Sequence, residues 1–218
     1  MKKAINAAGI KALLHDGMTI MSGGFMAVGA PEKLIDLLIE HDIKEITLIT
    51  TDTGSPGKGV SKLIAQKRVK KLYASHIGTN PETGQQMCDG SLEVELVPQG
   101  TLAERIRSAG AGLGGVLTPT GLGTIVAENK PVIEVNGQPF LLETPLKADL
   151  AIIRGSVVDK RGNIHYHKTT QNFNPLMATA ADVVIVEPVE LVEVGDIAPE
   201  TIHTPSLYVD HIYMEEHA

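Results

Sequence analysis

The sequence predicts an α/β protein built on an open, mainly parallel β-sheet with helices on both faces and a small antiparallel β insertion. Short apolar runs bounded by turn residues alternate with segments of helical periodicity, which is the order of elements in a parallel sheet. The chain has 218 residues, of which 43% are hydrophobic, so it suffices for one large domain and is short for two. We therefore expect a single domain over residues 1–218.

The first predicted unit is a strand, a glycine turn and a helix. Residues 18–21 form an apolar run, which indicates a strand buried on both faces. Gly23 and Gly24 follow, and glycine permits positive φ and the close approach of a ligand. Pro31 suits the first position of a helix, because its missing N–H costs nothing there. Apolar and polar residues then recur, up to Glu40, as in a helix with one face on a sheet.

The remaining elements rest on the same criteria. Thr101 and Glu104 form a capping-box pattern, which starts a helix. The pair Asn136-Gly137 marks a hairpin, which is the predicted antiparallel insertion. We expect strands at 45–50, 69–75, 92–97, 150–158, 164–167, 183–186 and 207–214, the hairpin at 132–142, helices at 1–17, 59–67 and 172–181, and loops at 76–90 and 117–123.

Composition narrows the class of protein. The net charge is −7 and no basic block stands out, which argues against nucleic acid as a partner. The N-terminal apolar stretch is broken by Asn6, Lys11 and His15, unlike a signal peptide, and no apolar run is long enough to span a membrane. Cys88 is the single cysteine, so no internal disulfide can form and a reducing compartment is expected. These features predict a cytoplasmic protein.

Two places in the predicted sheet suit a ligand. The glycine turn brings a strand end to a helix N-terminus, where free N–H groups and the positive end of the helix dipole favour an anionic group. Such turns also serve as plain connections, and the residues alone leave both readings open. Gln99 and Gly100 lie at the end of a strand and against the start of a helix, where open α/β sheets bind ligands.

Two other kinds of site are weaker candidates. Asp52 ends the second strand at the spacing of a ribose-binding acid, but the turn from Gly23 to Gly29 is not G-x-G-x-x-G. An acidic residue that closes a strand is more often a cap or a turn former. His165 and His167 point to the same side of a strand, yet no cysteine or carboxylate pattern accompanies them. We therefore favour an edge strand with two half-exposed histidines and assign no metal ligand.

No side chain is a convincing nucleophile. The sequence has no G-x-S-x-G, and Cys88 has no obvious partner in its polar segment. Glu128, Glu143 and Glu187 lie at strand or turn boundaries with nothing distinctive around them. We assign no catalytic residue, and expect either a binding scaffold or part of an active site that is completed elsewhere.

The glycine turn belongs to a longer pattern, Asp16-Gly17-x-x followed by Gly23-Gly24-Phe25-x-x-x-Gly29-x-Pro31. This pattern resembles the signature of the A (alpha) subunit of family I 3-oxoacid coenzyme A transferases. The likeness covers essentially the whole chain, and looks closest to bacterial enzymes that exchange CoA between acetate, acetoacetate or butyrate. It continues in order through SHIGTNPETG (75–84), EVELVPQGTLAERIR (93–107), GAGLGGVLTPTGLGT (110–124) and NFNP (172–175).

The resemblance implies a second chain. These enzymes pair an A and a B subunit of related α/β fold, commonly as an A2B2 tetramer, and work by a ping-pong mechanism. A glutamate in a Ser-Glu-Asn-Gly segment of the B subunit attacks the acyl-CoA, giving an acyl-glutamyl anhydride and then a glutamyl-CoA thioester. The second carboxylic acid resolves that thioester. Here Glu128 stands in Ala127-Glu128-Asn129-Lys130, which lacks both the serine and the glycine, so we expect the nucleophile on the partner.

The resemblance also implies the binding residues. The CoA thioester is a substrate, and no permanently bound cofactor is expected. Gln99, with Gly100 beside it, matches a residue that holds the acyl or carboxylate group, and an amide can donate to a developing oxyanion without adding charge. Thr51 stands where relatives often have an asparagine that contacts substrate, and Ser22 replaces the usual aliphatic residue. The CoA-contacting segment comprises Gly24, Phe25, Met26, Ala27, Val28, Gly29 and Ala30.

The leading expectation is the A subunit of a short-chain acyl-CoA transferase, which moves CoA from an acyl-CoA to a free carboxylate such as acetate, acetoacetate or butyrate. Two alternatives stay open. One is a non-catalytic nucleotide- or metabolite-binding module that uses the same turn together with Asp52. The other is a subunit of a dicarboxylate (succinyl) CoA transferase.

Overall fold

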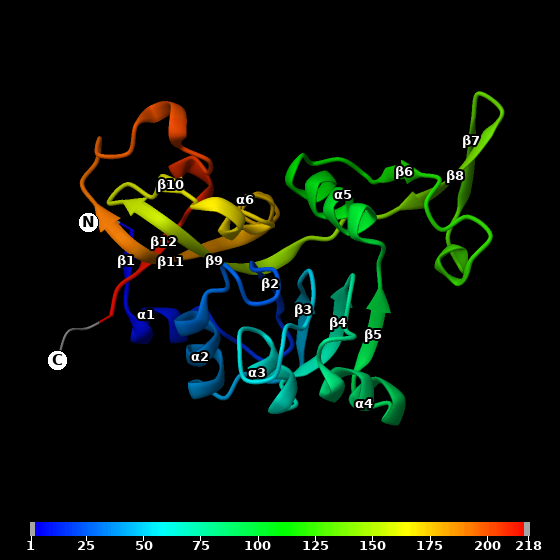
Figure 1. Ribbon diagram of the computed structural model, residues 1–218, viewed down its shortest axis with the longest axis horizontal. Helices are drawn as coiled ribbons and strands as arrows, with labels where there is room; N and C mark the ends of the chain where they lie inside the picture. The colour runs from blue at the N-terminus through cyan, green and yellow to red at the C-terminus, as the bar shows by residue number, and fades with distance from the viewer. Residues whose placement is uncertain (1–2, 216–218) are drawn as a thin grey trace.

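A single large sheet forms the centre of the molecule in the computed structural model, which describes residues 3–215 (Figure 1). It is nine-stranded, and neighbours along the path β1-β12-β11-β9-β2-β3-β4-β5 are parallel, while β10 pairs with β9 in antiparallel fashion. The strands are β1 Ala4–Ile5, β2 Thr19–Ser22, β3 Ile46–Ile49, β4 Val69–Ala74, β5 Glu93–Leu96, β9 Ala148–Asp159, β10 Ile164–His165, β11 Ala181–Val192 and β12 His211–Tyr213.

Helices cover both faces of this sheet, as predicted. Two hydrophobic cores result, because successive residues of a strand point to opposite faces. Ile20 and Met21 of β2 are both fully buried, the first in one core and the second in the other. This explains why the strand reads as a continuous apolar run. The first face carries α1 Ala7–Lys11, α2 Glu32–Glu40, α3 Ser61–Ala65 and α4 Pro81–Asp89, and the second carries α5 Gln99–Gly110 and α6 Asn174–Met177.

The predicted antiparallel insertion is present as a separate three-stranded sheet. It has the order β6-β8-β7 and projects from the body of the molecule (Figure 1). Asn136 and Gly137 form the turn of its hairpin with φ values of 52° and 76°, as a two-residue turn of this kind requires. The bounds are β6 Val116–Thr118, β7 Val132–Val135 and β8 Gln138–Glu143.

The segment 76–90 was expected to be a loop, and this is wrong. Asn80 caps α4 by accepting a hydrogen bond from the Glu82 N–H, at 3.2 Å, and Pro81 occupies the first turn. Gly90 ends the helix in the left-handed conformation. The buried residues of α4 are the polar Thr83 and Gln86, so no apolar periodicity marks this helix. In the sequence, this helix is marked only by the capping residues at its two ends.

The capping box at Thr101 is also wrong. Helix α5 already begins at Gln99, which places Thr101 inside the first turn and leaves Pro98 at the N-cap position without a side-chain hydrogen bond. Glu104 pairs instead with Arg107 one turn later, at 3.1 Å. The pattern was right about a helix and wrong about the residue at which it starts.

Several boundaries differ from those expected. The helix predicted at 1–17 is short, because β1 precedes α1, and residues 1–2 lie outside the described residues. The loop expected at 117–123 begins as β6, and the helix at 172–181 contracts to α6. Only part of 207–214 is strand, after short 3-10 helices at Pro199–Thr201 and Ser206–Tyr208; others lie at Ile125–Ala127 and Lys168–Thr170. The extent of the domain, 1–218, stays a prediction.

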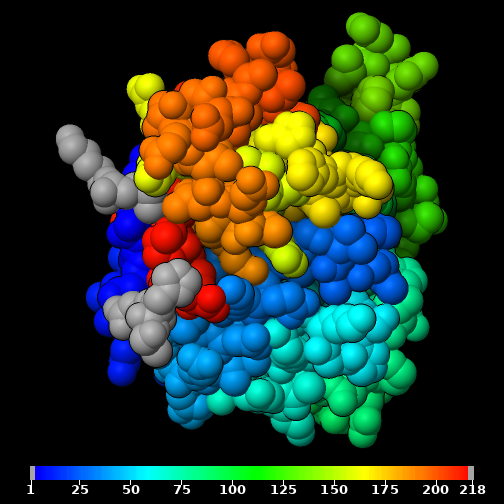
Figure 2. All heavy atoms as spheres, turned by 60° about the vertical axis from the view of Figure 1, so that its left-hand side comes forward, coloured from blue at the N-terminus to red at the C-terminus, as the bar shows by residue number. Residues whose placement is uncertain are grey.

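The two ends of the described chain lie together. β1 pairs with β12 at one edge of the sheet, and Figure 2 shows the blue and red parts of the chain side by side there. None of the helices formed by residues 3–215 has the length and apolar content needed to cross a membrane.

Candidate functional site

The predicted site residues meet at one edge of the sheet. Gly24 follows β2, Thr51 follows β3, Ser75 follows β4, and Gln99 opens the helix that follows β5. These four strands are parallel neighbours, so their carboxyl ends lie together. This is the edge at which open α/β sheets bind ligands.

Residues 24–30, here called the glycine loop, have a strained conformation. Phe25 and Val28 exchange two backbone hydrogen bonds, of 3.0 and 2.9 Å, as in a two-residue hairpin. Met26 and Ala27 between them have φ values of 50° and 65°. Such a turn usually contains asparagine and glycine, because other residues pay a steric cost in the left-handed region. The surrounding structure must therefore hold the turn in place.

Asp52 holds the tip of the glycine loop. Its carboxylate is buried and accepts the Met26 N–H at 3.0 and 3.2 Å through its two oxygens. It also accepts the Gly54 N–H at 2.7 Å and the Thr51 hydroxyl at 2.8 Å. With its oxygens engaged inside the protein, Asp52 supports the loop instead of presenting a carboxylate to a ribose.

Thr51 lies beneath the glycine loop. Its side chain is fully buried, and its hydroxyl lies 2.8 Å from both the Asp52 carboxylate and the Gly24 carbonyl oxygen, either of which can accept its single proton. The structure therefore gives this residue a contact with the loop. Direct contact with substrate, which the sequence suggested, stays a prediction.

Two asparagines of the NFNP segment hold the loop from the other side. Asn172 accepts the Gly24 N–H at 3.1 Å and donates to the Val28 carbonyl at 3.0 Å. Asn174 donates to the Gly29 carbonyl at 3.1 Å. A Cβ on Gly23 would stand 1.8 Å from the Asn174 Oδ1 atom, which explains why glycine is needed there. These asparagines have no role that the sequence alone reveals, because nothing local connects them with a turn far away in the chain.

The glycine loop presents apolar side chains outward. Phe25, Met26 and Val28 are 49%, 36% and 46% exposed, respectively. The N–H groups of Ala27 and Gly29 make no hydrogen bond within residues 3–215. Such a surface suits a ligand with an apolar chain.

Gln99 is exposed on the same edge, with Gly100 beside it in the first turn of α5. The Ser75 hydroxyl lies between the Thr51 carbonyl oxygen, at 2.6 Å, and the Gln99 side-chain amide, and its single proton can be donated to one of the two. The exposed Gln99 amide therefore sits beside Ser75 at this edge, where its NH₂ group can donate to a ligand.

A family model described as coenzyme A transferase matches residues 3–215. The chain belongs to the coenzyme A transferase family.

Individual relatives agree with this membership. The chain is 52% identical to an acetate CoA-transferase subunit alpha of Escherichia coli K12, over 93% of its own length and 92% of the relative. It is 51% identical to an acetoacetyl-CoA:acetate/butyrate CoA transferase alpha subunit of Clostridium acetobutylicum, over 98% of both chains.

A solved structure has the same fold. It is an acyl-CoA transferase of Escherichia coli O157:H7 in a thioester complex with CoA, with a TM-score of 0.86 and 18% identity. It matches 97% of this chain, which spans about half, 47%, of that structure. The family and the fold predicted from the sequence are thus confirmed.

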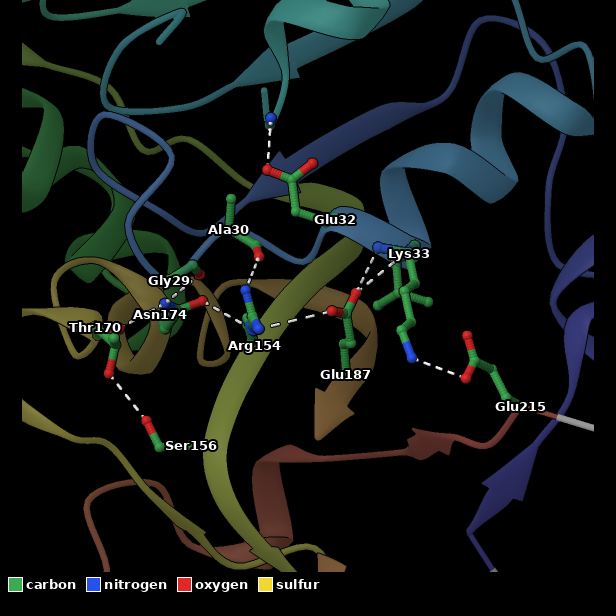
Figure 3. A network of polar contacts seen from close by, with 12 residues as sticks. Gly29, Ala30, Glu32, Lys33, Arg154, Ser156, Thr170, Asn174, Glu187 and Glu215 are labelled. Carbon is green, nitrogen blue, oxygen red and sulfur yellow. Dashed lines mark hydrogen bonds and ion pairs between the residues drawn. The ribbon is translucent and has the colours of Figure 1, made fainter. Parts of the chain in front are cut away.

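Nothing local in the sequence distinguishes Glu187, yet in the structure it makes an important contact. Its buried carboxylate accepts the N–H groups of Lys33 and Leu34, at 2.8 and 3.2 Å, at the start of α2 (Figure 3). Burial raises the pKa of Glu187, while these N–H groups and Arg154 act in the opposite direction.

The histidines considered as metal ligands have other contacts. The rings of His165 and His167 meet edge to face, with centroids 5.2 Å apart, and His203 stacks on His165 at 4.7 Å. A ring nitrogen of His165 is 2.9 Å from the Thr201 carbonyl oxygen. Residues 3–215 contain no group of three or more histidine, cysteine or acidic side chains suited to hold a metal.

Proposed function

We propose that this chain is the alpha subunit of a short-chain acyl-CoA transferase, which moves CoA from an acyl-CoA to acetate, acetoacetate or butyrate. The observation that carries the proposal is the likeness, at 51–52% identity over nearly the whole chain, to two transferase subunits of this kind. The enzyme is cytoplasmic and assembles as A2B2 with a beta subunit.

The residues of the site divide into two groups by role. The glycine loop forms one wall of the acyl-CoA site, where its exposed apolar side chains contact the CoA thioester. Gln99 donates its amide hydrogens to the acyl oxygen as negative charge develops on it, with Gly100 leaving room for the acyl group. Donors fixed in advance in this way stabilise the transition state because they need no reorganisation.

The bond changes take place on the partner's glutamate. Its carboxylate attacks the thioester carbonyl, the CoA thiolate leaves, and an acyl-glutamyl anhydride forms. The thiolate then attacks the glutamyl carbonyl and releases the first carboxylate. A second carboxylate reverses these steps and departs as the new acyl-CoA. In this chain Glu128, in Ala-Glu-Asn-Lys, does not take the role of that glutamate.

The test is to produce the chain with and without the beta subunit, then measure CoA transfer from acetoacetyl-CoA to labelled acetate. We expect transfer only from the assembled pair, and a borohydride-reducible thioester whose mass label falls on the beta subunit. Butyrate and succinate as alternative acceptors separate a short-chain from a dicarboxylate enzyme. Transfer by this chain alone, or a label on Glu128, would contradict the proposal.

A further inference from the structure

The exit of the glycine loop, where it joins helix α2, is held by side chains from distant strands. Pro31 occupies the N-cap position and has no side chain that could accept a hydrogen bond from the first turn. Glu187 of β11 supplies the missing acceptor, since one carboxylate oxygen receives both the Lys33 and the Leu34 N–H. The helix start is thereby tied to the sheet.

Arg154 of β9 holds the last residue of the loop. Its guanidinium donates to the Ala30 carbonyl at 3.3 Å, and its Nε atom lies 3.9 Å from a carboxylate oxygen of Glu187. Arg154 and Glu187 are direct partners in the register of β9 with β11, so the two side chains leave the sheet side by side. Figure 3 shows Arg154 between Ala30 and Glu187.

Asn174 adds a third connection at the same point. It accepts the backbone N–H of Arg154 at 3.1 Å and donates to the Gly29 carbonyl. The last two carbonyls of the glycine loop, those of Gly29 and Ala30, are therefore fixed by one group of side chains.

Burying the Arg154–Glu187 ion pair carries a free-energy cost. Glu187 is only 4% exposed, and an ionised carboxylate loses its hydration there. The Arg154 Nε atom is buried and has no hydrogen-bond partner among residues 3–215, which adds a further free-energy cost. A neutral acceptor could cap α2 at lower cost, so helix capping alone does not account for an ion pair at this place.

We propose that Glu187 and Arg154 are positioning residues for acyl-CoA, an ion pair that sets where the exit of the glycine loop stands against the CoA thioester. This inference rests on the proposed function, because it assumes that the loop contacts CoA. Neither side chain touches the reacting atoms. Their effect passes through the Ala30 carbonyl and the start of α2.

The decisive variant is Glu187→Gln in the assembled enzyme. Glutamine keeps the shape and one acceptor for α2 but removes the charge that orients Arg154. We expect kcat/KM for acyl-CoA to fall on the order of tenfold, and kcat/KM for the carboxylate to change by less than about twofold. The two kcat/KM values differ because CoA is already bound covalently when the carboxylate reacts. A shifted loop contact then affects the ground state and the transition state of that step equally.

Further variants distinguish a positioning role from a folding defect. Arg154→Met should reproduce the loss in kcat/KM for acyl-CoA, Arg154→Lys should restore part of it, and Glu187→Gln with Arg154→Met should cost no more than either alone. The matched control is Glu215→Gln, which removes an exposed carboxylate 2.8 Å from Lys33 at the same helix end. It should leave both rate constants unchanged.

The possible results distinguish a positioning role from a purely structural one. Equal losses in both kcat/KM values, together with a lower melting temperature, would mean that the pair only supports the fold, and would overturn the inference. Unchanged kinetics in Glu187→Gln and Arg154→Met would overturn it as well. Failure of the unmodified pair of subunits to transfer CoA would instead count against the proposed function.

Discussion

At the residue scale, single side chains decide the shape of the candidate site. Asp52 is the clearest case, because one buried carboxylate receives donors from the glycine loop, from Gly54 and from Thr51. The left-handed pair Met26 and Ala27 depends on it. Gln99 plays the complementary part, since its exposed amide lies beside Ser75 at the edge of the sheet.

Replacing Asp52 by asparagine should destabilise the protein by about 1–3 kcal/mol, because in either orientation an amide NH₂ would face a backbone N–H, that of Met26 or of Gly54, and weaken its pairing. Melting temperature measures this loss. The control is Asp182→Asn, at an exposed ion pair with Lys147, where little change is expected. An Asp52→Asn variant as stable as the control would refute the role of Asp52 in holding the glycine loop.

Replacing Gln99 by alanine should lower kcat by on the order of 10²-fold, since one preorganised donor to the developing oxyanion is lost. Steady-state kinetics of the assembled enzyme, with gel filtration to check assembly, measure the effect. Gln85→Ala on α4 removes another exposed amide away from the site and serves as the control. Unchanged turnover would remove Gln99 from the site.

At the element scale, the structure shows which local signals suffice to predict an element. β2 and β3 were predictable because burial on both faces requires a continuous apolar run. α4 was not, since its inward-facing residues are polar, and only the caps Asn80 and Gly90 mark it. The capping of α2 by Glu187 was beyond sequence analysis, because the two lie more than 150 positions apart.

The carboxylate that caps α2 also makes stability depend on pH. Burial holds the pKa of Glu187 above the ordinary value of 4.5, so the folded protein binds this proton more tightly than the unfolded chain does. Its contribution to stability therefore rises as pH falls through the raised pKa towards 4.5, and is lost as pH rises again.

We expect the stability of Glu187→Gln relative to the unmodified protein to fall as the pH is lowered from neutral to about 5, because only the unmodified protein gains stability by protonating this carboxylate. Melting curves of both proteins across this range provide the measurement. Asp42 and Asp89, whose pKa values are lowered by their partners, titrate equally in both proteins and cancel in the comparison. A stability difference independent of pH would contradict the expectation.

At the scale of the whole molecule, parallel pairing is what makes the site predictable in outline. Once β2 to β5 are recognised as parallel neighbours, Gly24, Thr51 and Gln99 must lie at one edge. Asn172, Asn174 and Glu187, which hold the glycine loop and the start of α2, come from the later half of the chain. Their positions depend on where β9 and β11 enter the sheet. No spacing in the sequence encodes that insertion, so these residues were missed.

The strand order also has a consequence for synthesis on the ribosome. β2 lies in the middle of the finished sheet, but its neighbour β9 ends only at Asp159, long after β2 to β5 have been made. During that interval the nascent sheet has β2 as an open edge, with an apolar strand and unpaired backbone groups exposed. The emerging chain is therefore most open to wrong pairing before β9 arrives, at the strand that later leads into the glycine loop.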